Sequence, residues 1–161
     1  MIIVAIDEVN FKKASTIIDN LDSKKCMVKI GSVAFNSIGR EVVSYADEKG
    51  FDIFLDLKLH DIPNTVANSV RKISNFNVAL TTIHLNGGKD MIEAASSEKG
   101  NIKILGVSIL TSLSENDIFE ITNTEFDTYF NNLISIASKT NVDGVVCSPN
   151  ELIKLKNFKK L

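Results

Sequence analysis

The chain has 161 residues, of which 44% are hydrophobic and 24% are charged, and its formal net charge at pH 7 is −2. This length is enough for a domain with its own hydrophobic core, so a single domain over residues 1–161 is expected. The charge balance gives no reason to expect nucleic-acid binding. No apolar run reaches the ~18–20 residues of a membrane span, and the N-terminus lacks the basic region of a signal peptide, so a cytoplasmic protein is expected.

Apolar runs alternate with amphipathic segments along the whole chain and predict a repeating strand–helix pattern. Strands are expected at residues 1–7, 26–31, 51–57, 79–85, 102–110 and 143–147. Helices are expected at 10–21 and 36–49, from Pro63, after the Asn86-Gly87-Gly88 turn, at 125–139, and after a capping box at 148–151, and a helical turn is expected from Ser114. The lysine-rich tail at 151–160 is expected to be a solvated helix face.

This repeat predicts an α/β protein in which helices cover a parallel sheet. A doubly wound sheet would normally carry a glycine-rich turn after the first strand, but the sequence there is DEVN. A (β/α)8 barrel instead places polar residues at the carboxyl ends of its strands. The chain has such residues at Asp7, Lys29, Asp56, Lys58, His84, Thr111 and Ser148. The barrel is therefore favoured, with about six of its eight units present.

The most informative stretch is residues 51–66, FDIFLDLKLHDIPNTV, in which a buried strand ends in a group of charges. Side chains alternate on a pleated strand, so Asp56 and Lys58 are expected on one face, about 7 Å apart along the chain. With Lys29 and Asp61 they would form alternating cations and anions. Such a group can destabilise a substrate carboxylate and protonate a nearby carbanion, as metal-free decarboxylation requires. Structural ion pairing at a strand end remains the alternative.

The sequence gives little support to a metal site. His60 lies near Asp56 and Asp61, but the lysine between them would repel a cation. His84 is expected to be a hydrogen-bonded residue at a strand end. Cys26 and Cys147 are far apart in strand-like segments, which predicts buried, reduced thiols rather than a disulfide.

Residues 56–66, DLKLHDIPNTV, resemble the DxKxxDIPxT signature of the orotidine 5′-phosphate decarboxylase family. Further segments resemble this family in the same order: VAID at 4–7, VKIG at 28–31, HLNGG at 84–88, LTS at 110–112 and DGVVCS at 143–148. The resemblance implies a TIM barrel that works as a homodimer without metal or organic cofactor. The implied reaction converts orotidine 5′-monophosphate to uridine 5′-monophosphate and CO2, the last step of de novo pyrimidine synthesis.

The resemblance also implies roles for individual residues. Lys58 would donate the proton to the carbanion at C6, and Asp56 would face the substrate carboxylate. Lys29 would hold the ribose and the neighbouring charges, and Asp7 would bind a ribose hydroxyl. Thr111 and Ser112 would contact the pyrimidine edge.

Two more residues are implied at a dimer interface: Asp61 and Thr65 would reach into the partner subunit's site. Members of the family continue through a seventh and an eighth strand, whose loops supply a phosphate-binding arginine and glycine. Neither segment is found in residues 1–161, so the chain is expected to be C-terminally incomplete and poorly active alone. Two alternatives stay open. One is a non-catalytic remnant or interaction domain. The other is a magnesium-dependent sugar-phosphate decarboxylase or aldolase of the same superfamily, against which the HDIPNTV continuation argues.

Overall fold

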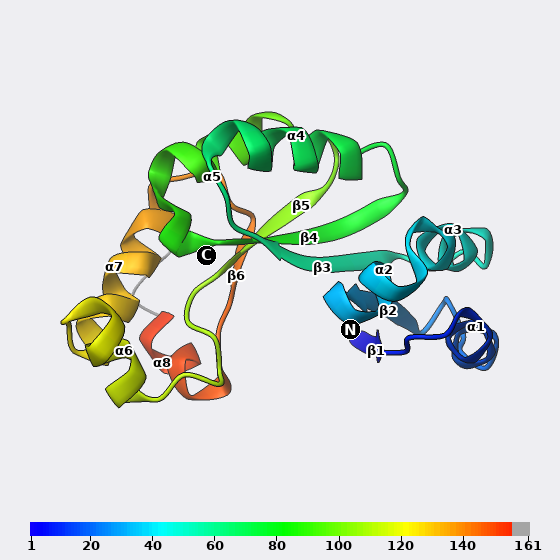
Figure 1. Cartoon of the computed structure of the whole chain (residues 1–161), viewed down its shortest axis with the longest axis horizontal. Helices are drawn as coiled ribbons and strands as arrows, with labels where there is room; N and C mark the ends of the chain where they lie inside the picture. Colours follow the sequence, from blue (N-terminus) through cyan, green and yellow to red (C-terminus); the bar gives the residue numbers. More distant parts are fainter. Residues whose placement is uncertain (156–161) are drawn as a thin grey trace.

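A computed structural model describes residues 1–155, in which six strands alternate with helices (Figure 1). The strands are β1 (Ile2–Ile6), β2 (Cys26–Gly31), β3 (Ile53–Leu59), β4 (Val78–His84), β5 (Lys103–Val107) and β6 (Gly144–Val146). The α-helices are α1 (Phe11–Asp19), α2 (Ser32–Ile38), α3 (Arg40–Glu48), α4 (Pro63–Ile73), α5 (Gly88–Ser97), α6 (Glu115–Thr122), α7 (Phe126–Ser138) and α8 (Leu152–Leu155). Short 3₁₀ turns cover Leu85–Gly87 and Pro149–Glu151.

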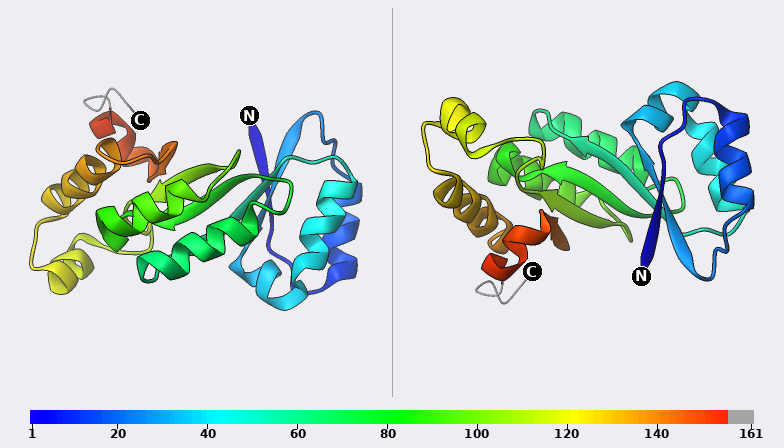
Figure 2. Two further views of the ribbon diagram at one scale, coloured as in Figure 1. Left: turned by 90° about the horizontal axis from the view of Figure 1, so that it is seen from above. Right: turned by 90° about the horizontal axis from the view of Figure 1, so that it is seen from below.

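The sheet is entirely parallel, and its strands follow one another in the order β1-β2-β3-β4-β5-β6. A doubly wound sheet reverses its strand order at a switch point, and this sheet does not. The helices form an arch around the outside of the curled sheet, and β1 and β6 lie at its two edges (Figures 1 and 2). The expected barrel-type architecture is confirmed: the six strands form a curled half-barrel.

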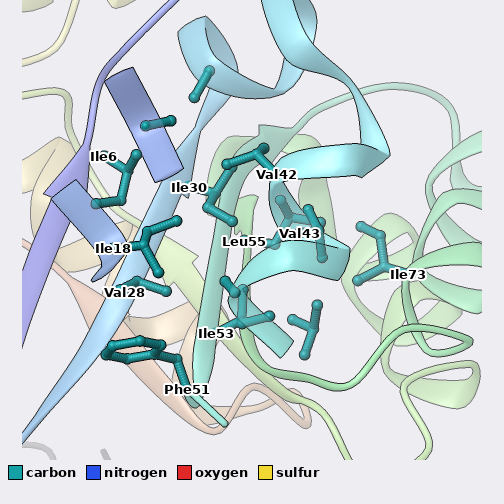
Figure 3. Packing of buried hydrophobic residues seen from close by; sticks show 14 of the residues in the cluster. Ile6, Ile18, Val28, Ile30, Val42, Val43, Phe51, Ile53, Leu55 and Ile73 are labelled. Atoms are coloured by element: carbon teal, nitrogen blue, oxygen red, sulfur yellow. The ribbon is translucent and has the colours of Figure 1, made fainter. Parts of the chain in front are cut away.

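Apolar side chains fill the space between the sheet and its helices. One cluster joins β1, β2 and β3 to α1 and α3, with Ile18, Val28, Val43 and Leu55 fully or almost fully buried (Figure 3). Each such side chain stabilises the fold by about 1.5–3 kcal/mol. A second cluster joins β4 and β5 to α4, α5 and α7. A small third cluster, Met27, Phe54 and Leu80, contains only strand residues and therefore lies on the concave face.

Local capping signals place several helices where the sequence predicts them. The Asn10 side chain accepts a hydrogen bond from the Lys13 amide, and Pro63 is the first residue of α4. The capping box at Ser148 is present as well. Residues 114–122 form more than the expected turn, because Ser114 and Asp117 make a capping box that opens a full helix.

Four local predictions need correction. The single helix predicted at 36–49 is two helices, because Gly39 has φ +80° and its backbone cannot continue a helix. The strand predicted at 51–57 runs instead from Ile53 to Leu59, and the one predicted at 102–110 ends at Val107. Cys26 and Cys147 are free thiols but only partly buried.

The lysine-rich tail is only partly described. Lys154 is not simply solvated, because its ammonium pairs with the Asp127 carboxylate and lies over the Phe126 ring. Residues 156–160 of the predicted tail lie outside the described residues.

Candidate active site

Four charged residues on three neighbouring strands meet at the carboxyl edge of the sheet. Asp7 follows β1, Lys29 lies in β2, and Asp56 and Lys58 lie in β3. The Lys58 Nζ is 2.7 Å from Asp56 Oδ2, and the Lys29 Nζ is 3.9 Å from the same oxygen and 3.7 Å from Asp7 Oδ1. These four residues, called the charge array below, alternate in sign across the sheet.

Burial within the charge array is uneven. The Asp56 side chain is 10% exposed, whereas those of Lys58 and Asp7 are 37% and 62% exposed. A buried carboxylate is costly unless cations and hydrogen-bond donors surround it, and the two lysines provide the cations. The array therefore has a buried anion at its centre and ammonium groups that a ligand from solvent can reach.

A break in the β3–β4 pairing shapes this edge. Leu55 pairs with Thr81 and Leu59 pairs with Ile83, so Asp56, Leu57 and Lys58 lie opposite the single residue between Thr81 and Ile83. Lys58 has φ +50°, in the left-handed region that side chains other than glycine rarely adopt. Asp56 and Lys58 do come together as the sequence predicts, but on a bulged strand rather than on a regular pleat.

Thr82 belongs to this cluster although no motif in the sequence marks it. It is completely buried, and its Oγ1 lies 2.8 Å from Asp56 Oδ1 and 2.9 Å from the Lys58 backbone nitrogen. The only signal in the sequence is a pair of hydroxyl residues inside an otherwise apolar strand.

The other predicted site residues do not touch the charge array within residues 1–155. Asp61 is exposed, and its carboxylate accepts a hydrogen bond of 2.6 Å from the Ile62 amide. Thr65 is exposed in the first turn of α4. Thr111 and Ser112 are exposed in the loop between β5 and α6. No hydrogen bond or ion pair in the described part of the chain joins these four residues to the array.

Two histidines stand beside the array. The rings of His60 and His84 have centroids 5.4 Å apart. Burial lowers the pKa of His84 below its ordinary value of 6.5, and the nearby His60 and Lys58 lower this pKa further. His84 is therefore a neutral side chain at neutral pH.

A pocket of about 110 Å³ opens at the same end of the sheet, beyond β4 and β5. His84, Asn86 and Ser108 line it together with apolar side chains of the following loop, α6 and α7. Among residues 1–155, no group of three or more His, Cys, Asp or Glu side chains could hold a metal ion. No helix in this range is long and apolar enough to cross a membrane.

The strand order and the charged carboxyl edge define a protein of the (β/α) barrel class with a polar site above its strands. Residues 1–161 match the model of the orotidine 5′-phosphate decarboxylase / HUMPS family, and the chain belongs to this family. The orotidine 5′-phosphate decarboxylase of Baumannia cicadellinicola is 40% identical over 164 residues, which cover 98% of this chain and 66% of that protein.

Solved structures agree with this assignment. The crystal structure of orotidine 5′-phosphate decarboxylase from Lactobacillus acidophilus is 33% identical, has a TM-score of 0.90, and is matched over 97% of this chain and 75% of that one. The enzyme from Methanocaldococcus jannaschii, complexed with the inhibitor BMP, is 21% identical with a TM-score of 0.80, which supports the fold alone; the match covers 99% of this chain and 74% of that one. The chain spans about two thirds of the length of the curated relatives it matches.

Proposed function

We propose that this chain carries the reaction centre for decarboxylation of orotidine 5′-monophosphate to uridine 5′-monophosphate and CO2. The observation that supports this most strongly is the way in which the charges of the array contact one another. Asp56, the buried anion, shares its Oδ2 between two ammonium groups, 2.7 Å and 3.9 Å away. Family membership and the 40% identical relative named for this reaction give independent support.

The chemistry follows from the signs of these charges. A substrate carboxylate placed against Asp56 is repelled, and this repulsion disappears as the carboxylate leaves as CO2. The bond from C6 to the carboxylate carbon breaks, and its electron pair stays on C6. Lys58 stabilises that negative charge and then transfers a proton from Nζ to C6, which forms the C6–H bond. The neutral amine afterwards regains a proton from water.

Other residues are proposed to hold the nucleotide. Lys29 and Asp7, in contact at 3.7 Å, would hold the ribose hydroxyls at the solvent side of the array. Thr111 and Ser112 would contact the pyrimidine edge from the loop after β5. Both are exposed, which leaves their hydroxyls free to meet a ligand.

We also propose a homodimer in which Asp61 and Thr65 reach the partner's site. Both residues are exposed and flank Ile62, whose side chain is 67% exposed despite being apolar. A second copy of the chain that covers Ile62 would bury this surface. Sedimentation velocity is expected to show a dimer, and Ile62→Glu is expected to shift it toward monomer; a wild-type monomer at all concentrations would contradict this part of the proposal.

The test of the function is release of labelled CO2 from carboxyl-labelled orotidine 5′-monophosphate, together with one equivalent of uridine 5′-monophosphate. The protein should be produced in a host that lacks its own decarboxylase, and Lys58→Ala serves as the blank. Residues 1–161 match about two thirds of the length of the curated relatives, so their turnover alone is expected to be slower than that of a relative whose remaining third also contacts the substrate. Absence of product would contradict the proposal and favour a non-catalytic role, whereas equal product from Lys58→Ala would remove Lys58 from the donor role.

A further inference from the structure

One buried hydroxyl, that of Thr82, touches both residues to which the proposed reaction assigns the chemistry. Its Oγ1 lies 2.8 Å from Asp56 Oδ1 and 2.9 Å from the backbone nitrogen of Lys58. Thr82 has no exposed surface, so it cannot touch a substrate directly. Any effect that it has on the reaction must pass through its two neighbours.

The donors and acceptors in these two hydrogen bonds follow from the groups themselves. The Lys58 N–H can only donate, so the threonine oxygen accepts this hydrogen bond. The ionised Asp56 carboxylate can only accept, so the single hydroxyl proton points to its Oδ1. The single hydroxyl proton is thus committed to Asp56, and neither bond can reverse while the carboxylate is charged.

Each bond fixes a different degree of freedom. The bond to Oδ1 sets the rotation of the Asp56 carboxylate, so that Oδ2 faces the Lys58 ammonium 2.7 Å away. The bond from the Lys58 amide holds a backbone with φ +50° at the point where β3 and β4 lose their regular pairing. A left-handed residue of this kind is strained and persists only where the surroundings hold it.

We propose that Thr82 is a positioning residue for decarboxylation: its hydroxyl holds the Asp56 carboxylate and the Lys58 backbone in one fixed geometry. This inference rests on the proposed function, since it assigns the reacting roles to Asp56 and Lys58. A small displacement of either group moves the proton donor away from C6, and misplacements of about 1 Å can lower rates by about 100-fold.

The chain offers a matched control in the adjacent residue. Thr81 is also completely buried, and its hydroxyl donates to the Leu55 carbonyl at 2.9 Å. Thr81→Val and Thr82→Val therefore remove the same hydroxyl from the same strand. The Thr81 hydroxyl has no bond to the charge array in the described structure, so Thr81→Val measures the purely structural effect.

The kinetic test compares four proteins: the wild type, Thr82→Val, Thr82→Ser and Thr81→Val. Thr82→Val is expected to lower kcat by about 10- to 100-fold, with KM changed by less than about threefold. Thr82→Ser keeps the hydroxyl and is expected to retain kcat within about threefold, as is Thr81→Val. The proposal is overturned if Thr82→Val keeps the wild-type kcat, or if Thr81→Val loses as much. If Thr82→Val does not fold, Thr82→Ala removes the same hydroxyl and is judged by the same criteria.

A second measurement does not depend on turnover. The Lys58 amide proton is expected to exchange with solvent at least about tenfold faster in Thr82→Val than in wild type or Thr82→Ser, because it loses its acceptor. Unchanged exchange would refute the hydrogen bond that the proposal needs. If the wild type forms no product, the proposed function fails, while the exchange rates still decide whether Thr82 holds the Lys58 backbone.

Discussion

Two substitutions of Lys58 separate the role of its ammonium from the strain in its backbone. Lys58→Ala and Lys58→Gly both remove the proposed proton donor, so both are expected to lower turnover by about 10²- to 10⁴-fold, the usual contribution of general acid catalysis. They differ in backbone freedom. Lys58 has φ +50°, which alanine tolerates poorly and glycine adopts readily.

The size of the stability difference follows from this conformation. A left-handed residue with a Cβ costs roughly 1–2 kcal/mol, and the extra freedom of glycine in the unfolded chain costs roughly 0.5–1 kcal/mol. Lys58→Gly should therefore be at least as stable as Lys58→Ala, by up to about 1.5 kcal/mol, or up to about 6 °C in Tm. The ion pair with the largely buried Asp56 carboxylate is lost in both variants, so its contribution cancels from the comparison.

The assay combines CO2 release with thermal unfolding of the two variants and a control. Lys25→Ala is a suitable control, because Lys25 is also paired, with Asp22 at 3.3 Å, but precedes β2 at the opposite end of the sheet. Its turnover is expected to equal that of the wild type. Full turnover in either Lys58 variant would remove Lys58 from the donor role, and a lower Tm for Lys58→Gly than for Lys58→Ala would refute the argument from strain.

Three further predictions concern metal, pH and packing. A chelator such as EDTA is expected to leave turnover unchanged, because two ammonium groups already neutralise the buried carboxylate of the array; activity restored only by magnesium would favour a sugar-phosphate enzyme instead. Burial lowers the pKa of His84 below 6.5, and the nearby His60 lowers it further. As the pH falls below 6.5, a proton therefore binds to the unfolded chain before it binds to the native protein, and the native protein loses stability. His84→Asn should weaken this loss in denaturant titrations at pH 7.5 and pH 5.5, by no more than about 1.4 kcal/mol per pH unit, and an unchanged pH dependence would refute the assignment. A Cβ at Gly106 would lie 2.4 Å from Leu85 Cδ2, so Gly106→Ala should lower the free energy of unfolding by about 1–3 kcal/mol. Gly144→Ala should cost less, because its Cβ would lie 3.1 Å from the nearest atom, Leu105 Cδ2. Equal losses in thermal unfolding would contradict the packing argument.

Features that depend on neighbouring residues in the chain could be predicted well from the sequence. The β2 strand at Cys26–Gly31 and the start of α4 at Pro63 are both where the sequence places them. The reason is that apolar runs, capping residues and proline act over a few residues. Gly39 shows the limit of this approach. A glycine within a helical pattern can continue the helix or divide it, and here its φ of +80° divides the predicted helix into α2 and α3.

The sequence by itself determined the parallel α/β class and the presence of Asp7, Lys29, Asp56 and Lys58 at strand ends, because strand and helix periodicities are local. Only the tertiary structure decided how these charges meet. The shared Asp56 Oδ2, the left-handed backbone at Lys58 and the bridging hydroxyl of Thr82 all depend on the register between β3 and β4. Register arises from packing between residues far apart in the chain, and for that reason no local motif marks Thr82.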